Sequence, residues 1–286
     1  MRVSVVILTW NSARWLPDCL ASVVPQVLSL GGELIIVDNG STDASLELVR
    51  KLAPSAILIA NRRNRGVAPA RNQGIRASRG FYIVLLDVDT RVPAGTLAHL
   101  TTYMDTNPSI GILGPKLVYP DGTLQYSCRR YPTLGTKLLR RLPRGAGERF
   151  LWYEQYRDWD HSSPRDVDYV IGACQVIRRQ VLDQTGLLDE AMFYGPEDVD
   201  LCLRARLCGW RVVYYPYAQV VHCEERVTRR QPLSRLNYLH ARALIRYFAK
   251  HRYLFSRKTI YRRIWDSQPK GGMADAAIGV GSHDRI

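Results

Sequence analysis

The sequence lacks the features of membrane-spanning and secreted chains. Its longest apolar runs, at residues 3–8 and 81–86, fall far short of the ~20 residues that span a bilayer. From Met1 the chain enters a strand-like run, without the longer apolar stretch and small-residue cleavage site of a signal peptide. Charged residues make up 23% and hydrophobic residues 46%, which is ordinary globular composition. We therefore expect a globular protein in the cytoplasm.

Several common site motifs are also missing. The six cysteines include no Cys-x-x-Cys pair, so free buried thiols are favoured over disulfides or a structural zinc site. Residues 64–74 contain glycine, but they form neither Gly-x-Gly-x-x-Gly nor a P-loop. NAD enzymes and standard NTPases are therefore disfavoured.

Acidic residues are scarce towards the end of the chain. Residues 226–266 hold twelve Lys or Arg and one acid, Asp266, which gives this segment +11 of the total +14. Helical spacing would put four cations on one stripe: Arg235, Arg242, Arg246 and Lys250. It would put apolar residues on another: Leu233, Leu236, Leu244, Tyr247 and Phe248. We expect a basic helical extension, which either packs on the body or contacts an anionic membrane surface, and a disordered tail over 267–286.

Apolar strand-like runs alternate with helical patterns through the first half of the chain. The expected strands lie at 3–8, 34–37, 56–60, 81–86 and 110–113. The expected helices lie at 12–24, from about 41, at 67–78 and at 93–105. This alternation predicts an α/β fold with a mainly parallel central sheet flanked by helices.

The second half shows weaker periodicity. It predicts a hairpin turn at 119–122, an irregular excursion over 128–165, strands at 168–177 and 211–215, and a helix at 197–208. We expect one domain over 1–225, with a nucleotide-binding half at 1–115 and an acceptor-binding half at 116–225.

Two carboxylates, Asp87 and Asp89, follow the buried-strand pattern at 81–86. At the carboxyl end of such a strand, carboxylates can hold a divalent cation together with the phosphates of a ligand. A solvated acidic turn is the alternative, because Asp is common after strands. His222 ends a later apolar run and is either a third ligand or a structural residue. The pattern predicts a site for Mg²⁺ or Mn²⁺.

Another carboxylate, Asp38, ends the strand expected at 34–37, where it could accept a hydrogen bond from a base N–H. Turn and capping chemistry explains Gly40 and the following Ser41 and Thr42, either of which is expected to cap the next helix, but it does not require Asp38.

In the segment 64–74, Gly66 permits close backbone approach, and Arg71 adds a cation one turn into the helix that follows. The N-terminus of that helix could face an anion. A polar helix start explains this segment equally well.

Three carboxylates begin the helix expected at 197–208. The helix dipole favours acidic residues at this end, which is the simpler interpretation. The functional interpretation is a general base that takes a proton from an acceptor hydroxyl, with its pKa raised by neighbouring like charges. Asp198 is the first candidate and Glu197 the second, whereas Asp200 is expected to pair with Arg204 or Arg206.

In this order and at these distances, the segments resemble the family-two glycosyltransferases with the GT-A fold, above all their bacterial rhamnosyltransferase-like members. The resemblance covers about residues 3–225. It rests on residues 5–11, 38–43, 64–74, 87–89, 172–174 and 193–204.

The resemblance implies an inverting, metal-dependent transfer from a nucleotide diphosphate sugar. The residues that it implies at the nucleotide-sugar are Leu8, Thr9, Trp10, Asn11, Asp38, Gly66, Arg71, Asp87 and Val88. It implies that Asp87, Asp89 and His222 hold the cation. It also implies Asp198, or Glu197, as the base. The residues that it implies at the acceptor or sugar are Gly172, Ala173 and Cys174.

The Gln-x-x-Arg-Trp motif of processive synthases is absent, which implies the addition of one sugar. After His222 the chain reads Cys-Glu-Glu-Arg, without the glycine and serine of many relatives. Within the resemblance, dTDP-rhamnose is the first expectation for the donor and a UDP-hexose the second. A lipid-linked saccharide or cell-surface glycan at the inner face of the membrane is the expected acceptor.

Two other functions fit less well. A nucleic-acid-binding protein would suit the basic segment, but no recognised nucleic-acid module appears and the charge lies outside the motif-bearing region. A nucleotidyltransferase would show a glycine-rich first loop followed by Arg, whereas residues 9–12 read Thr-Trp-Asn-Ser.

Overall fold

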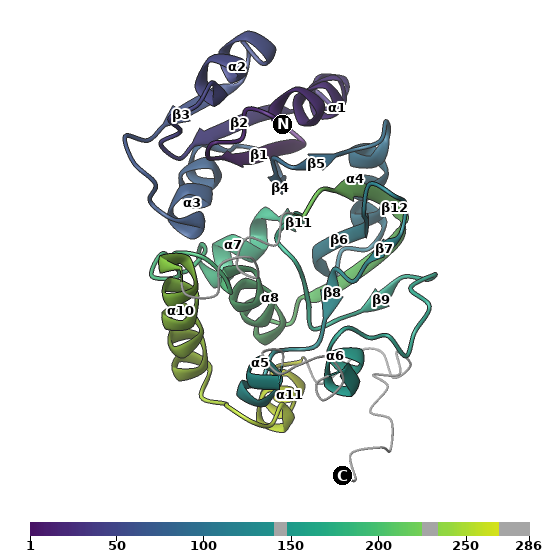
Figure 1. Ribbon diagram of the computed structural model, residues 1–286. Coiled ribbons are helices and arrows are strands. Elements are labelled where there is room, and N and C mark those ends of the chain that lie inside the picture. The colour runs from purple at the N-terminus through teal and green to yellow at the C-terminus, as the bar shows by residue number, and fades with distance from the viewer. Residues whose placement is uncertain (140–147, 225–233, 269–286) are drawn as a thin grey trace.

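A ten-stranded sheet runs through the molecule (Figure 1). The computed structural model describes residues 1–139, 148–224 and 234–268. The sheet begins with four parallel strands in the spatial order β3 (Ile57–Ala60), β2 (Glu33–Asp38), β1 (Val3–Thr9) and β4 (Tyr82–Asp87). It continues through β11 (Cys174–Arg178), β6 (Ile110–Val118), β12 (Arg211–His222) and β5 (Thr90–Arg91).

The inner parallel strands β1, β2 and β4 are buried on both faces, as their apolar sequences require, whereas the edge strand β3 is partly exposed. Val6 of β1 joins one hydrophobic cluster, whereas Val5 and Ile7 join another on the opposite face, because successive strand residues point to opposite sides. The helices of this half are α1 (Leu16–Ser29), α2 (Ser45–Leu52), α3 (Val67–Ala77) and α4 (Thr96–Thr106). The α/β fold with a mainly parallel sheet is confirmed.

The register of these strands brings their carboxyl ends to one edge. Thr9 lies opposite Asp38, and Leu8 lies opposite Asp87. Residues that are far apart in the sequence therefore meet where an open α/β sheet usually binds its ligand.

The second half differs in detail from its predicted elements. The strand predicted at 168–177 is two strands, β10 (Tyr169–Val170) and β11, while β12 continues well past its predicted end. The helix predicted at 197–208 is α8 (Glu197–Leu207), which follows α7 (Arg179–Thr185). The hairpin turn is present, with the Gly122 amide donating to the Tyr119 carbonyl at 2.9 Å, and it leads into β7 (Leu124–Gln125).

The predicted excursion over 128–165 contains short elements. They are β8 (Cys128–Arg129), α5 (Leu134–Leu139), α6 (Glu148–Glu154) and β9 (Arg165–Asp166). Residues 140–147 lie outside the described part of the chain. All six cysteines are free, and four of them are buried.

The predicted start of α2 is wrong. The helix begins at Ser45, because Ser41 and Thr42 hydrogen-bond to Asn11 in the loop after β1 instead of capping. Asn11 donates its amide to the Ser41 hydroxyl at 2.9 Å and accepts from the Thr42 amide at 2.8 Å. Asp43 accepts from the Ser45 amide at 3.0 Å.

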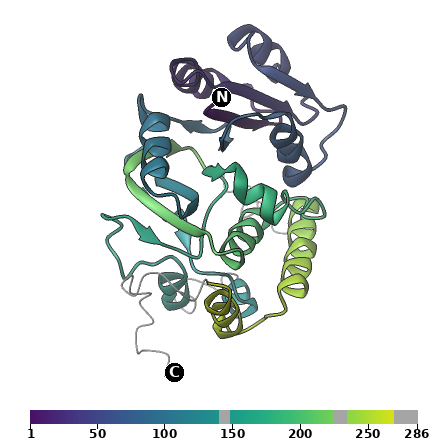
Figure 2. The ribbon, with the colours of Figure 1, turned by 180° about the vertical axis from the view of Figure 1, so that it is seen from behind.

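The basic extension forms two helices, α10 (Arg235–His251) and α11 (Lys258–Ser267). Figures 1 and 2 both place α10 alongside α7 and α8 and below α3, while α11 lies nearer the end of the molecule that is farthest from β3. The buried face of α10 comprises Ala243, Tyr247, Phe248 and His251. Leu233 and the predicted tail beyond 268 lie outside the described residues. Among the described helices, none is both long enough and apolar enough to cross a bilayer.

Candidate active site

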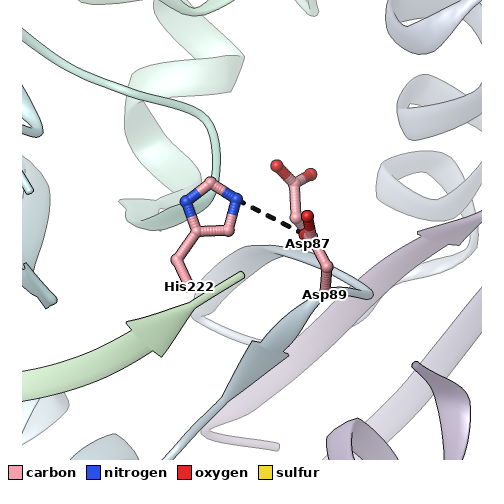
Figure 3. A group of neighbouring side chains, drawn as sticks. All are labelled: Asp87, Asp89 and His222. Atoms are coloured by element: carbon pink, nitrogen blue, oxygen red, sulfur yellow. Dashed lines mark ion pairs between the residues drawn. The ribbon is translucent and has the colours of Figure 1, made fainter. Parts of the chain in front are cut away.

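Three possible metal ligands converge at the carboxyl edge of the sheet (Figure 3). Asp87 ends β4, Asp89 follows in the turn before β5, and His222 ends β12. Because β5 pairs with β12, His222 lies opposite Thr90, and the Cys223 amide donates to the Asp89 carbonyl at 2.8 Å. One donor atom from each of the three side chains lies within 4.8 Å of the other two, and Nε2 of His222 is 3.4 Å from Oδ1 of Asp89.

The chemistry of these three side chains fits a divalent cation. Burial raises the pKa of Asp87, with a further contribution from Asp89, while Arg71 opposes the increase. Burial alone would lower the pKa of His222, but the carboxylates of Asp89 and Asp87 outweigh burial and raise it. Two carboxylates and an imidazole form a donor set that suits Mn²⁺ and, with more oxygen ligands, Mg²⁺.

Arg71 of α3 connects the metal cluster to the carboxylates of α8. Its Nη2 donates to Oδ1 of Asp87 at 2.6 Å and to the Gly172 carbonyl at 2.7 Å, and its Nη1 lies 3.4 Å from Oε1 of Glu197. The residue is only 4% exposed. The resemblance implied a place near the nucleotide, and the described contacts put Arg71 between Asp87 of the metal cluster and Glu197.

The two candidate bases have different surroundings. Glu197 is buried, and its Oε2 has no hydrogen-bond partner among the residues that the structure describes. Burial together with Asp198 raises its pKa to about 7 against the opposing effect of Arg71. Asp198 is partly exposed. It accepts hydrogen bonds from the Gly172 amide at 3.0 Å and the Val199 amide at 2.8 Å. Asp198 is therefore the more accessible carboxylate, held in a defined orientation.

The segment of Gly172, Ala173 and Cys174 contacts the site through its backbone. The Ala173 carbonyl accepts from the Asp87 amide at 3.0 Å, and Cys174 pairs with Leu86 in β4. A side chain at Gly172 would collide with Arg71, because an added Cβ would lie 2.5 Å from Nη1. The side chains of Ala173 and Cys174 are buried.

The nucleotide edge expected from the sequence lies beside the metal cluster. Leu8, next to Thr9 in β1, is only partly buried, while Val88 is buried between Asp87 and Asp89. Oδ1 of Asp38 accepts from the amides that follow it, whereas its Oδ2 and the Thr9 hydroxyl are buried without a partner among the described residues. Trp10 is 52% exposed. A buried polar atom without a partner favours a ligand or water at that position.

Asn39 is a structural residue of this edge that sequence reasoning did not single out. Its side-chain oxygen accepts from the Arg65 amide at 3.0 Å, and its nitrogen donates to Asn64 at 3.0 Å and to the Gly66 carbonyl at 3.2 Å. Gly66 has φ +94°, and an added Cβ would lie 2.7 Å from Phe193. The sequence offered one signal for this role: Asn39 and Asn64 follow the ends of the adjacent strands β2 and β3.

Asp200 joins α8 to the C-terminal helix. The predicted pair with Arg204 is present at 2.8 Å, while Arg206 donates to a backbone carbonyl instead. Lys250 and His251 of α10 each lie 2.8 Å from Oδ1 of Asp200. Burial alone would raise the pKa of Asp200, but these partners hold it well below its usual range.

Comparison with known proteins identifies the family. The model of glycosyl transferase family 2 matches residues 4–186 of the 286 in this chain. The chain belongs to glycosyltransferase family 2. This glycosyltransferase is 30% identical over 248 residues to an N-acetylglucosaminyl-diphospho-decaprenol L-rhamnosyltransferase of Mycobacterium tuberculosis, with coverage of 81% of this chain and 79% of the relative. The resemblance to rhamnosyltransferase-like members is confirmed.

Solved structures confirm the GT-A fold of this glycosyltransferase. A mannosyltransferase from Pyrobaculum calidifontis, in complex with GDP-Man and Mn²⁺, matches with a TM-score of 0.62 and 21% identity over 93% of this chain and 68% of its own. Residues 1–349 of S. aureus TarS match with a TM-score of 0.57 and 19% identity over 90% of this chain and 73% of that one.

Proposed function

We propose that this glycosyltransferase moves one rhamnose from a nucleotide diphosphate sugar to a lipid-linked saccharide, with inversion at the anomeric carbon. The reaction type rests on one observation: the candidate metal ligands and the two candidate bases meet at one edge of the sheet. Arg71 contacts Asp87 and Glu197. It also contacts the carbonyl of Gly172, whose amide donates to Asp198. The sugar and the acceptor rest on the similarity to the mycobacterial rhamnosyltransferase.

Asp87, Asp89 and His222 would hold Mg²⁺ or Mn²⁺. When bound, the cation would offset the negative charge of the departing diphosphate. The residues proposed to border the nucleotide-sugar are Leu8, Thr9, Trp10, Asn11, Asp38, Gly66, Arg71, Asp87 and Val88. Among them, Asp38 has a carboxylate oxygen with no partner in the described part of the chain, which suits recognition of a base N–H.

Asp198 would be the general base. In a single displacement, the acceptor oxygen forms a bond to the anomeric carbon as the bond from that carbon to the diphosphate breaks, and the hydroxyl proton passes to Asp198. The hydrogen bond from Gly172 aims the carboxylate, and its partial exposure leaves room for an acceptor. Glu197 is the second candidate. The backbone of Gly172, Ala173 and Cys174 would border the acceptor or sugar.

The C-terminal helices would contact an anionic membrane surface that carries the acceptor. Their outward side chains include large apolar groups that are more than two thirds exposed: Tyr238, Ile245, Phe255 and Trp265. Exposed cations lie among them: Arg242, Lys258, Arg262 and Arg263. This mixture suits the interfacial region of a negatively charged bilayer. Flotation with anionic liposomes tests the contact, and no binding at low salt would contradict it.

A thermal-shift panel of dTDP, UDP and GDP sugars, with and without Mn²⁺ or Mg²⁺, tests the donor and the cation. A ligand that binds only the folded state at a hundredfold excess over Kd stabilises it by about 2.7 kcal/mol. We expect a metal-dependent shift with dTDP-rhamnose that Asp89→Ala abolishes. A shift with UDP-hexoses alone would replace dTDP-rhamnose with a UDP-hexose as the proposed donor. The absence of any metal-dependent shift would contradict the metal site.

Sugar transfer needs a second assay. Purified full-length chain is incubated with dTDP-rhamnose, Mn²⁺ and a polyprenyl diphosphate N-acetylglucosamine, and products are separated by mass. We expect one added deoxyhexose. A product with several added sugars, or none despite nucleotide binding, would contradict the proposed reaction.

A further inference from the structure

Gln125 contacts the candidate metal cluster from outside the ligand set. It is 3% exposed and ends β7, which pairs with β6. Its Oε1 lies 2.8 Å from Nδ1 of His222, and its Nε2 donates to Oε2 of Glu224 at 3.2 Å. The Tyr119 hydroxyl donates to the same carboxylate oxygen at 3.3 Å. The side chains of Glu224, Gln125 and His222 therefore form a continuous series of hydrogen bonds.

The direction of each hydrogen bond follows from its acceptor. A carboxylate can only accept, so the amide NH₂ of Gln125 faces Glu224 and the amide oxygen faces His222. An amide oxygen also accepts only, so Nδ1 of His222 carries the proton. In the neutral ring this leaves the lone pair on Nε2, the atom that faces Asp89 at 3.4 Å.

We propose that Gln125 is a positioning residue for the cation, because it holds His222 in the Nδ1–H tautomer with Nε2 directed at Asp87 and Asp89. This inference rests on the proposed metal site. Glu224 acts one step further out by orienting the Gln125 amide. It is exposed, so water can replace part of its effect. Glu224 is the first glutamate of the Cys-Glu-Glu-Arg sequence that follows His222, so this sequence contributes a residue that orients Gln125.

Mn²⁺ binding to the metal-free full-length chain tests the proposal without an activity assay. The free Mn²⁺ signal in electron paramagnetic resonance gives Kd for the wild type and for Gln125→Leu, a substitution of similar size that removes the acceptor. Loss of a hydrogen-bonded partner of a metal-binding histidine typically weakens metal affinity about 10–100-fold, and we expect that range here. Glu224→Gln is expected to weaken affinity less.

The double variant Gln125→Glu with Glu224→Gln is the matched control. It exchanges the amide and the carboxylate, so the total charge is unchanged, and a carboxylate at 125 still accepts the Nδ1 proton. We expect it to bind Mn²⁺ within a few-fold of wild type. A thermal melt of each variant separates loss of the site from loss of the fold.

Nitrogen-15 spectra of labelled histidine in the metal-free protein give a second readout. We expect His222 to carry its proton on Nδ1 in the wild type and in the double variant, and to lose this fixed tautomer in Gln125→Leu. Wild-type affinity in a folded Gln125→Leu would overturn the role of Gln125 alone. Failure of the wild type to bind Mn²⁺ would overturn the metal site itself, and this inference with it.

Discussion

The proposed nucleotide edge and the proposed acceptor side of this site are held together in different ways. At the nucleotide edge, each loop is fixed by short hydrogen bonds from a neighbouring strand end, as where Asn11 bonds to Ser41 and Thr42. On the proposed acceptor side, Glu197 and Asp200 of α8 depend on charged partners from distant segments, including Arg71 and Lys250. We infer that substitutions at the nucleotide edge act locally, whereas substitutions on the acceptor side alter stability and catalysis together.

The largest expected effect tests the proposed base. Asp198→Asn retains the shape of the side chain but cannot accept the hydroxyl proton, so kcat should fall about 10²–10⁴-fold while nucleotide binding is unchanged. Steady-state kinetics and a nucleotide thermal shift measure the two quantities. A kcat within threefold of wild type would remove Asp198 from the mechanism and leave Glu197 as the candidate.

The matched substitution at the nucleotide edge is Asp38→Asn. It should weaken nucleotide binding and leave the melting temperature of the ligand-free protein nearly unchanged, because Asn can still accept the local hydrogen bonds from Gly40 and Ser41. If Asp38→Asn and Asp198→Asn had equal effects on nucleotide binding, the proposed difference between the nucleotide edge and the acceptor side would be wrong.

Arg71→Met should show the next largest effect, on stability. Removing the guanidinium leaves Asp87 and Glu197 without their shared cation, and breaking a buried pair costs about 3–5 kcal/mol. Denaturant unfolding measures the loss. Replacement of the exposed Arg62 in the same way is the control and should change the free energy of unfolding by less than about 0.5 kcal/mol. Equal stability of the two variants would show that Arg71 is not required for folding.

The raised pKa of Glu197 predicts that the free energy of unfolding depends on pH. Its pKa is about 7 in the folded protein against an ordinary value of 4.5, so the folded state holds the proton more tightly. Its contribution to stability is full below pH 4.5 and is lost as the pH rises to about 7. Relative to wild type, Glu197→Gln should gain about 3 kcal/mol across this window. A difference that does not vary with pH in unfolding experiments would contradict the raised pKa.

His251→Ala should have the smallest effect of the series. It removes one partner of the buried Asp200, at a cost of about 1–3 kcal/mol, and should also lower kcat because Asp200 lies in the same turn of α8 as Asp198. Arg242→Ala, on the exposed face of the same helix, is the control. If both variants have wild-type kcat and stability, α10 does not support the site.

The difference between local patterns and contacts from distant segments also explains which parts of the site could be predicted from the sequence. Asp87, Asp89 and His222 follow apolar runs, and strand ends in such a sheet converge, so their proximity could be inferred from pattern. The buried position of Arg71 could not, because helical spacing does not say which distant carboxylate a side chain meets. The contact between α10 and Asp200 could not be predicted from the sequence for the same reason.

The error at α2 has a related cause. Ser41 and Thr42 have the right chemistry for an N-cap, but Asn11 from another loop competes for their hydrogen bonds. Local capping rules describe one segment at a time and do not include such a competitor. The fold class was predictable because alternation of strands and helices is a property of long stretches, which single contacts do not overturn.

The short pairing of β5 with β12 also determines when the metal cluster can form. The ladder that holds Asp89 beside His222 joins Thr90 and Arg91 to the far end of a strand beyond α8. Contacts of such high sequence separation require a long loop to close, so they form late in folding. A cation held at the proposed metal site would therefore bind the folded chain, so it would slow unfolding without speeding assembly.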